Sequence, residues 1–139
     1  MASAYASKRQ VESYVKRWLP KLGLSGWRVR VELVHPLASG IEIQPNAHGE
    51  AVVSAHTQNA ILRLAWPPDP ATDVEVTVVH ELSHLYFPLD SDDKEFEKSY
   101  TYVRTEQGVD MTANLLVRMD RENRANRKLA PVKRKAKRR

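Results

Sequence analysis

The sequence His80-Glu81-Leu82-Ser83-His84 places two histidines four residues apart, with a glutamate directly after the first. On a helix, residues at this spacing share one face with Cβ atoms about 5–6 Å apart. Both imidazoles can then reach one zinc ion at about 2.0–2.1 Å. The carboxylate beside them can accept a proton from zinc-bound water. The pattern therefore predicts a zinc site in which Glu81 is the general base of a hydrolytic reaction.

A catalytic zinc usually has three protein ligands and one open position, and two acidic residues are candidates for the third ligand. Glu106 lies 22 residues after His84 in a stretch with helical periodicity, and Asp110 follows it by one turn. If Glu106 binds the metal, Asp110 can accept a hydrogen bond from a ligand histidine and fix its tautomer. Asp90, six residues after His84, is the competing ligand if the chain turns back at Pro88.

Hydrophobic periodicity predicts one helix and three strands ahead of the histidine motif. The second and third strands are separated by a two-residue link, which is typical of a hairpin. Pro20 and Gly23 are expected to end the helix, and the proline-rich segment 67–70 is expected to end the sheet. The predicted ranges are residues 11–19 for the helix and 27–33, 50–57 and 60–66 for the strands.

The histidine motif itself is predicted to lie on a helix that Thr72 or Asp73 caps and Pro88 ends. More helix follows, and we expect Gly108 to divide it into two. The predicted fold is α+β. An N-terminal helix and a small three-stranded mixed or antiparallel sheet precede the motif helix and one or two helices that carry the third ligand.

Charge divides the chain into two parts. Residues 121–139 hold ten Lys or Arg and a single acid, a charge of +9, whereas residues 1–120 hold 12 bases and 16 acids, a charge of −4. Apolar residues also become rare after residue 120. We therefore predict one folded domain over residues 1–120 and a basic tail over residues 121–139 that is disordered, or helical only in its first turns.

The tail can contact nucleic acid through its charge alone, with strong salt dependence. It has no aromatic residue for base stacking, so such binding is expected to be non-specific. A solubilising terminus or a nuclear address is the alternative interpretation. The candidate contacts are Lys133, Arg134, Lys135, Lys137, Arg138 and Arg139.

The absence of cysteine excludes disulfides, cysteine-ligated zinc and thiol catalysis. The first seven residues do not form a signal peptide, and no apolar run approaches the roughly 18 residues of a membrane span. We expect a cytoplasmic monomer without a membrane partner.

Two segments resemble known metallopeptidases. Thr77–Tyr86, TVVHELSHLY, resembles the extended HExxH signature of the zincins, and Glu106–Asp110 resembles the ExxxD element of their gluzincin branch. The chain is similar in size and motif spacing to minimal gluzincins, including metallopeptidases of phages and prophages. Those proteins have the same order of elements as predicted here. The resemblance implies His80, His84 and Glu106 as zinc ligands, Glu81 as general base and Asp110 as the partner of a ligand histidine.

The metzincin branch fits less well, because Phe87 occupies the position where that branch has glycine. Asp90 does match a rarer acidic variant of its third ligand. The likeness to zincins also implies that Ile61–Trp66 is an edge strand that pairs with an extended peptide substrate. A second donor to the oxyanion is expected, and four residues remain candidates: His56, Tyr86, Tyr100 and Tyr102.

The resulting functional prediction is a zinc-dependent metallopeptidase that cleaves protein or peptide substrates in the cytoplasm of a bacterium or a phage-infected host. The alternative is a non-catalytic DNA-associated or adaptor protein whose zinc is structural. Glu81 distinguishes the two, because a purely structural site does not need a base beside an open coordination position.

Overall fold

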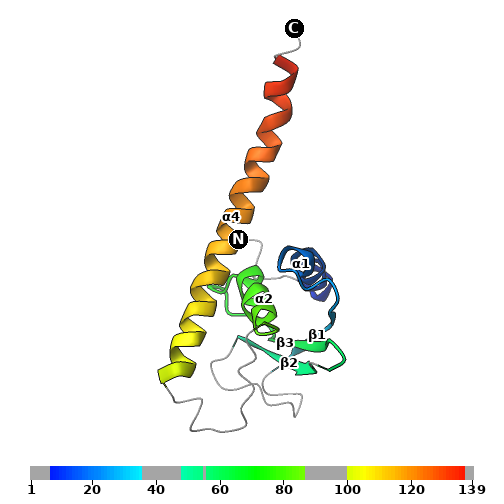
Figure 1. Cartoon of the computed structure of the whole chain (residues 1–139), viewed down its shortest axis with the longest axis vertical. Coiled ribbons are helices and arrows are strands. Elements are labelled where there is room, and N and C mark those ends of the chain that lie inside the picture. Colours follow the sequence, from blue (N-terminus) through cyan, green and yellow to red (C-terminus); the bar gives the residue numbers. More distant parts are fainter. Residues whose placement is uncertain (1–6, 36–47, 55, 87–99, 137–139) are drawn as a thin grey trace.

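The computed structural model describes residues 7–35, 48–54, 56–86 and 100–136, with side chains in the last helix described for residues 103–129. Within these ranges, one helix is followed by three strands and two more helices, which is the order expected, and the prediction of an α+β fold is confirmed (Figure 1). The elements are α1 (Lys8–Lys21), β1 (Arg28–Val34), β2 (Gly49–Ser54), β3 (Asn59–Ala65), α2 (Val74–Ser83) and α4 (Tyr100–Ala136).

The strands form one mixed sheet in the order β1-β3-β2, with β3 parallel to β1 and antiparallel to β2. The prediction that Ile61–Trp66 is an edge strand is therefore wrong, since β3 has a neighbour on both sides. Its apolar residues are nearly continuous rather than alternating, as is typical of a central strand. Gln58, in the turn between β2 and β3, has a positive φ of 52°.

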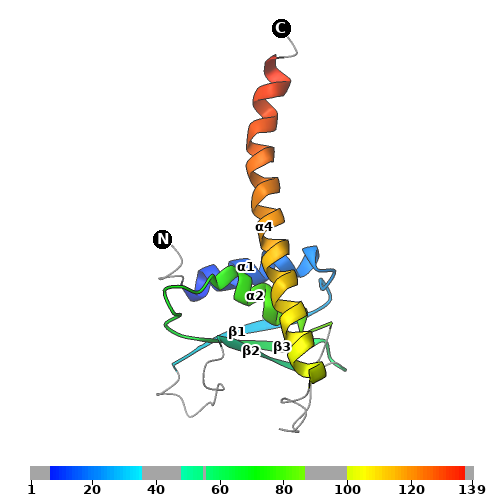
Figure 2. The same cartoon turned by 90° about the vertical axis from the view of Figure 1, so that its left-hand side faces the viewer.

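Helices α1 and α2 cover one face of the sheet, as Figure 2 shows. The core lies between these helices and the sheet and combines side chains of α1, α2, α4 and the strands. It includes Val11, Val15, Trp18, Leu62, Leu64, Val78, Val79, Leu82, Ala113 and Val117. The opposite face carries charged side chains, where Glu32 pairs with Arg30 at 2.8 Å and with Arg63 at 3.1 Å. This division explains the polar alternation of β1. None of the described helices combines the length and the apolar character needed to cross a bilayer.

The motif helix α2 begins where expected and ends earlier than expected. Asp73 is its N-cap, and the carboxylate accepts a hydrogen bond from the Val76 backbone N–H at 3.4 Å. The helix ends at Ser83, and the next residues tighten into turns that bond to carbonyls three residues back. The expected end at Pro88 is therefore five residues too late; Pro88 itself lies outside the described residues.

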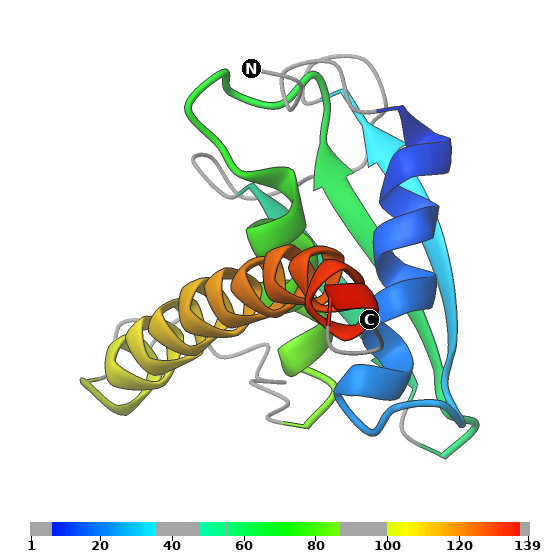
Figure 3. The same ribbon diagram turned by 90° about the horizontal axis from the view of Figure 1, so that it is seen from above.

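Helix α4 corrects two predictions, because it runs without interruption from Tyr100 to Ala136. Gly108 does not divide it: a Cβ there would meet nothing within 4 Å, and the roughly 1 kcal/mol cost of glycine in an exposed helix is offset by packing of neighbouring turns. The prediction of disorder from residue 121 is also wrong. Residues 121–130 are mostly good helix formers without Gly or Pro, and the preceding turns are docked on the domain. Seen from above, α4 passes over α2 (Figure 3).

Candidate metal centre

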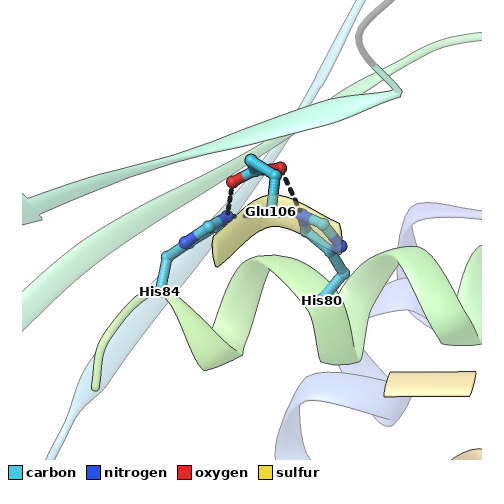
Figure 4. Close-up of side chains that lie close together, drawn as sticks. All are labelled: His80, His84 and Glu106. Carbon is cyan, nitrogen blue, oxygen red and sulfur yellow. Dashed lines mark hydrogen bonds and ion pairs between the residues drawn. The ribbon is translucent and has the colours of Figure 1, made fainter. Parts of the chain in front are cut away.

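Three potential metal ligands converge from two helices (Figure 4). Helix α2 presents His80, its C-cap residue His84 follows one turn later, and α4 presents Glu106 opposite them. The Glu106 carboxylate oxygens lie 3.2 Å from His80 Nε2 and 2.9 Å from His84 Nε2, while the two Nε2 atoms are 3.3 Å apart. Sequence spacing predicted the histidine pair, and the helix crossing adds Glu106.

The donor set fits a zinc ion. Two tetrahedral ligands held at about 2.0–2.1 Å from one zinc are about 3.3–3.4 Å apart. The two histidine Nε2 atoms, 3.3 Å apart, match this value, and one ligand atom from each of the three residues lies within 4.8 Å of the others. Two imidazoles and one carboxylate are ordinary ligands of catalytic zinc sites, whereas structural sites more often use cysteine.

Asp110 lies beside the outer nitrogen of His80. Its Oδ1 atom is 3.6 Å from His80 Nδ1, which is an ion-pair distance rather than a direct hydrogen bond. The Asp110 side chain is 63% exposed, so it is less buried than its expected role requires. A small movement of the Asp110 carboxylate toward His80 Nδ1 would form a hydrogen bond that orients the imidazole.

Glu81 is buried under the first residue of β2. Its side chain is 7% exposed, and a Cβ added at Gly49 would lie 3.4 Å from Glu81 Cγ and 2.9 Å from the Arg63 carbonyl oxygen. Glycine is needed at this position because that Cβ would also lie 2.8 Å from Leu64 Cδ2, so the contacts that exclude a side chain are with the neighbouring strand β3. Gly49 was not recognised from the sequence, where its signal was a glycine at the start of a strand.

The charges of the site set distinct protonation states. Burial raises the pKa of Glu81 to about 7, although the charges of His80 and His84 oppose the shift. Burial also tends to raise the pKa of Glu106, but hydrogen bonds to both histidines prevail and lower it to about 2. At neutral pH, Glu106 is therefore anionic, whereas Glu81 is present in both its protonated and its ionised form.

Both histidines hold protons more strongly than usual. Burial lowers the pKa of His80 and of His84, but the hydrogen bond to Glu106 and the charges of Glu106 and Glu81 together raise it above the ordinary value. A histidine must lose its proton before it binds a metal. When its pKa is raised, protons therefore compete with the metal for the ring nitrogen up to a higher pH.

We therefore expect zinc affinity to fall as the pH is lowered from about 8 to about 6, with up to about two protons released per zinc bound. Isothermal titration calorimetry in buffers of different ionisation enthalpy measures this release. Glu106 stays ionised throughout this range and contributes nothing to the slope. An affinity independent of pH across the interval would contradict histidine ligation.

A buried ion network joins α2 to α4 beyond the histidines. Glu75 is 3% exposed; it accepts hydrogen bonds from Trp18 Nε1 at 3.2 Å and from Arg121 Nε at 3.2 Å, and it pairs with Arg17. Beside it, the buried Asp120 pairs with Lys21 at 2.8 Å and with Arg124 at 3.0 Å. The partners of Glu75 come from segments 46 and 57 residues away.

In the part of the chain that the structure describes, no other predicted site residue is placed at the metal centre. His56 is exposed, and Tyr86 is 49% exposed with its hydroxyl 2.9 Å from the position of a Cβ at Gly23. Asp90 lies outside the described residues, as do the side chains of Tyr100 and Tyr102 and of the basic cluster, Lys133, Arg134, Lys135, Lys137, Arg138 and Arg139.

Comparison with protein-family models, with curated proteins and with solved structures found no match to this chain. Function is therefore inferred from the side chains and their geometry.

Proposed function

We propose that the chain is a zinc-dependent peptidase in which His80, His84 and Glu106 hold the metal. The observation that carries the proposal is the convergence of these three ligand atoms next to a buried glutamate. Zinc bound there would polarise the scissile carbonyl and make its bound water more acidic. Among the described residues the cluster contains three ligands, which fits a site with an open position for substrate.

Glu81 is assigned the proton transfers. Its carboxylate accepts the proton of the attacking water and then donates it to the leaving amine. In the metal-free protein, burial raises the pKa of Glu81 to about 7, which favours proton exchange near neutral pH. This role accounts for an otherwise costly feature, a carboxylate buried beneath a glycine-led strand.

Strand β2 is assigned the peptide-binding role that the sequence had given to Ile61–Trp66. Of the three described strands, β2 and β1 are at the margins of the sheet, and β2 contacts α2. An extended peptide added along the outer margin of β2 would pass close to Gly49 and thus to Glu81. Backbone hydrogen bonds would hold the substrate there without requiring particular side chains.

The ligand set is tested by zinc affinity, measured in competition with a chromophoric chelator. Wild type is expected to bind about one zinc ion per chain, and Glu106→Ala to weaken binding by more than about 100-fold. Asp110→Asn should weaken it by only about 10-fold, because an exposed outer partner is at the lower end of such effects.

Glu122→Ala is the matched control, since it removes an exposed glutamate from the same helix. Wild-type affinity in Glu106→Ala, combined with loss of zinc in Asp90→Ala, would reassign the third ligand to Asp90.

A further inference from the structure

The end of α4 is unusual in its exposure. Beyond Asp120 the helix continues to Ala136 and extends away from the domain (Figure 1), and we call residues 121–136 the projecting segment. Every described side chain from residue 121 to residue 129 is exposed. A helix in this position must have its side chains solvated or covered by a partner.

The projecting segment concentrates positive charge, and its described cations Arg127 and Lys128 are exposed. Arg121 and Arg124 are paired at its base with Asp73, Glu75 and Asp120. Beyond them the sequence adds eight more Lys or Arg residues and no acid. Like charges on adjacent turns destabilise a helix, so an anionic partner would stabilise this one.

The apolar content of the segment argues against a membrane as that partner. A helix that lies on a bilayer needs an apolar face, usually with aromatic residues. The projecting segment has no aromatic residue, and its larger apolar side chains are limited to Leu129 and Val132. A polyanion with charge along its whole length fits better.

Double-stranded DNA has matching dimensions. The segment is about 24 Å long, and an α-helix about 10–12 Å wide enters a major groove about 12 Å wide. The major groove of duplex RNA is too deep and narrow for side chains to read. Duplex DNA carries one negative charge per about 1.7 Å, which supplies a phosphate for each cation of the segment.

We propose that the projecting segment of α4 binds double-stranded DNA through its phosphates, without preference for sequence. The paired arginines hold the segment on the domain, and the contacts come from the cations that follow. Glu106 lies about 32 Å from Arg127 along the same helix. DNA binding therefore does not require the metal site, and this inference goes beyond the proposed peptidase function.

The experiment measures fluorescence anisotropy of a labelled DNA duplex over a series of salt concentrations. We expect wild type to bind and log K to fall linearly with log salt. Neutralising five cations beyond the paired arginines should weaken binding by about 100-fold or more and reduce the slope by about 4–5. The test variant combines R127Q, K128Q, K133Q, R134Q and K135Q.

The matched control removes the same charge from exposed sites on α1 and β1, and should retain the wild-type slope. It combines K8Q, R9Q, K16Q, R28Q and R30Q. Circular dichroism and zinc affinity confirm that both variants fold. Equal losses in the two variants would overturn the proposal, because binding would then follow net charge alone.

Three further arms complete the test. Glu106→Ala should lose zinc and still bind DNA as wild type does. That result would show that DNA binding does not depend on the proposed metal site. Tighter binding at the same salt to vesicles that contain an anionic lipid would overturn the proposal in favour of a membrane. Tighter binding to duplex RNA would overturn the assignment to DNA, and so would the absence of wild-type DNA binding at about 0.1 M salt.

Discussion

Glu81→Gln is expected to bind zinc within about 10-fold of wild type and to lose about 10²–10⁴-fold in kcat for peptide hydrolysis. Glutamine has the size of glutamate, so the buried position under β2 remains filled. The amide cannot accept a proton from water, whereas the ligands His80, His84 and Glu106 are untouched. Hydrolysis is measured by mass spectrometry on a proteome-derived peptide library, and kcat is then measured on a cleaved peptide.

The control for this variant is Glu122→Gln, which makes the same chemical change at an exposed site and should leave kcat unaltered. If Glu81→Gln hydrolyses peptide at the wild-type rate, Glu81 is not the general base. If zinc-loaded wild type cleaves no peptide in the library, the protein is better described as a non-catalytic zinc-binding protein.

Glu75→Ala is expected to lower the free energy of unfolding by about 3 kcal/mol, the lower end of the range for breaking a buried ion pair. The variant leaves the Arg17 guanidinium and the Trp18 N–H without their buried acceptor. The other partners, Arg121 and Arg124, are 47% and 44% exposed, so water can hydrate them and limit the loss. Against a typical domain stability of about 5–15 kcal/mol, this is a large change.

Urea unfolding of the metal-free protein, followed by circular dichroism, measures the effect without a contribution from bound zinc. Glu12→Ala is the matched control. Glu12 is 53% exposed and pairs only loosely with Lys8 at 4.0 Å, so its loss should cost less than about 0.5 kcal/mol. A change below about 1 kcal/mol in Glu75→Ala would show that the network is not a main support of the α2–α4 contact.

Local features of the site were predictable because they depend on one helix. The spacing of His80 and His84 determines that they share a face, whatever the rest of the fold does. Asp73 was recognisable for the same reason as one of two candidate caps, beside Thr72. From the sequence, Glu106 was only one of two candidates for the third ligand, because its approach to the histidines depends on how α4 packs on α2.

Features that depend on distant segments were missed. The central position of β3 follows from its parallel pairing with β1, which no short-range pattern encodes. Gly49 matters because β3 and α2 both lie close to it, and Glu75 is buried because two other segments, α1 and α4, supply its partners. The continuity of α4 past Gly108 reflects tertiary packing that outweighs a weak local preference.

If the proposed site binds a metal, the arrangement of its ligands would make metal loading and folding a single linked equilibrium. Two ligands belong to α2 and the third to α4, and α4 attaches to the domain mainly along α2. An ion that binds all three ligands would therefore cross-link the two helices. Free zinc at about 100 times its Kd would add about 2.7 kcal/mol to the free energy of unfolding. The availability of zinc in the surroundings would then set how firmly α4, and with it the projecting segment, is held to the domain.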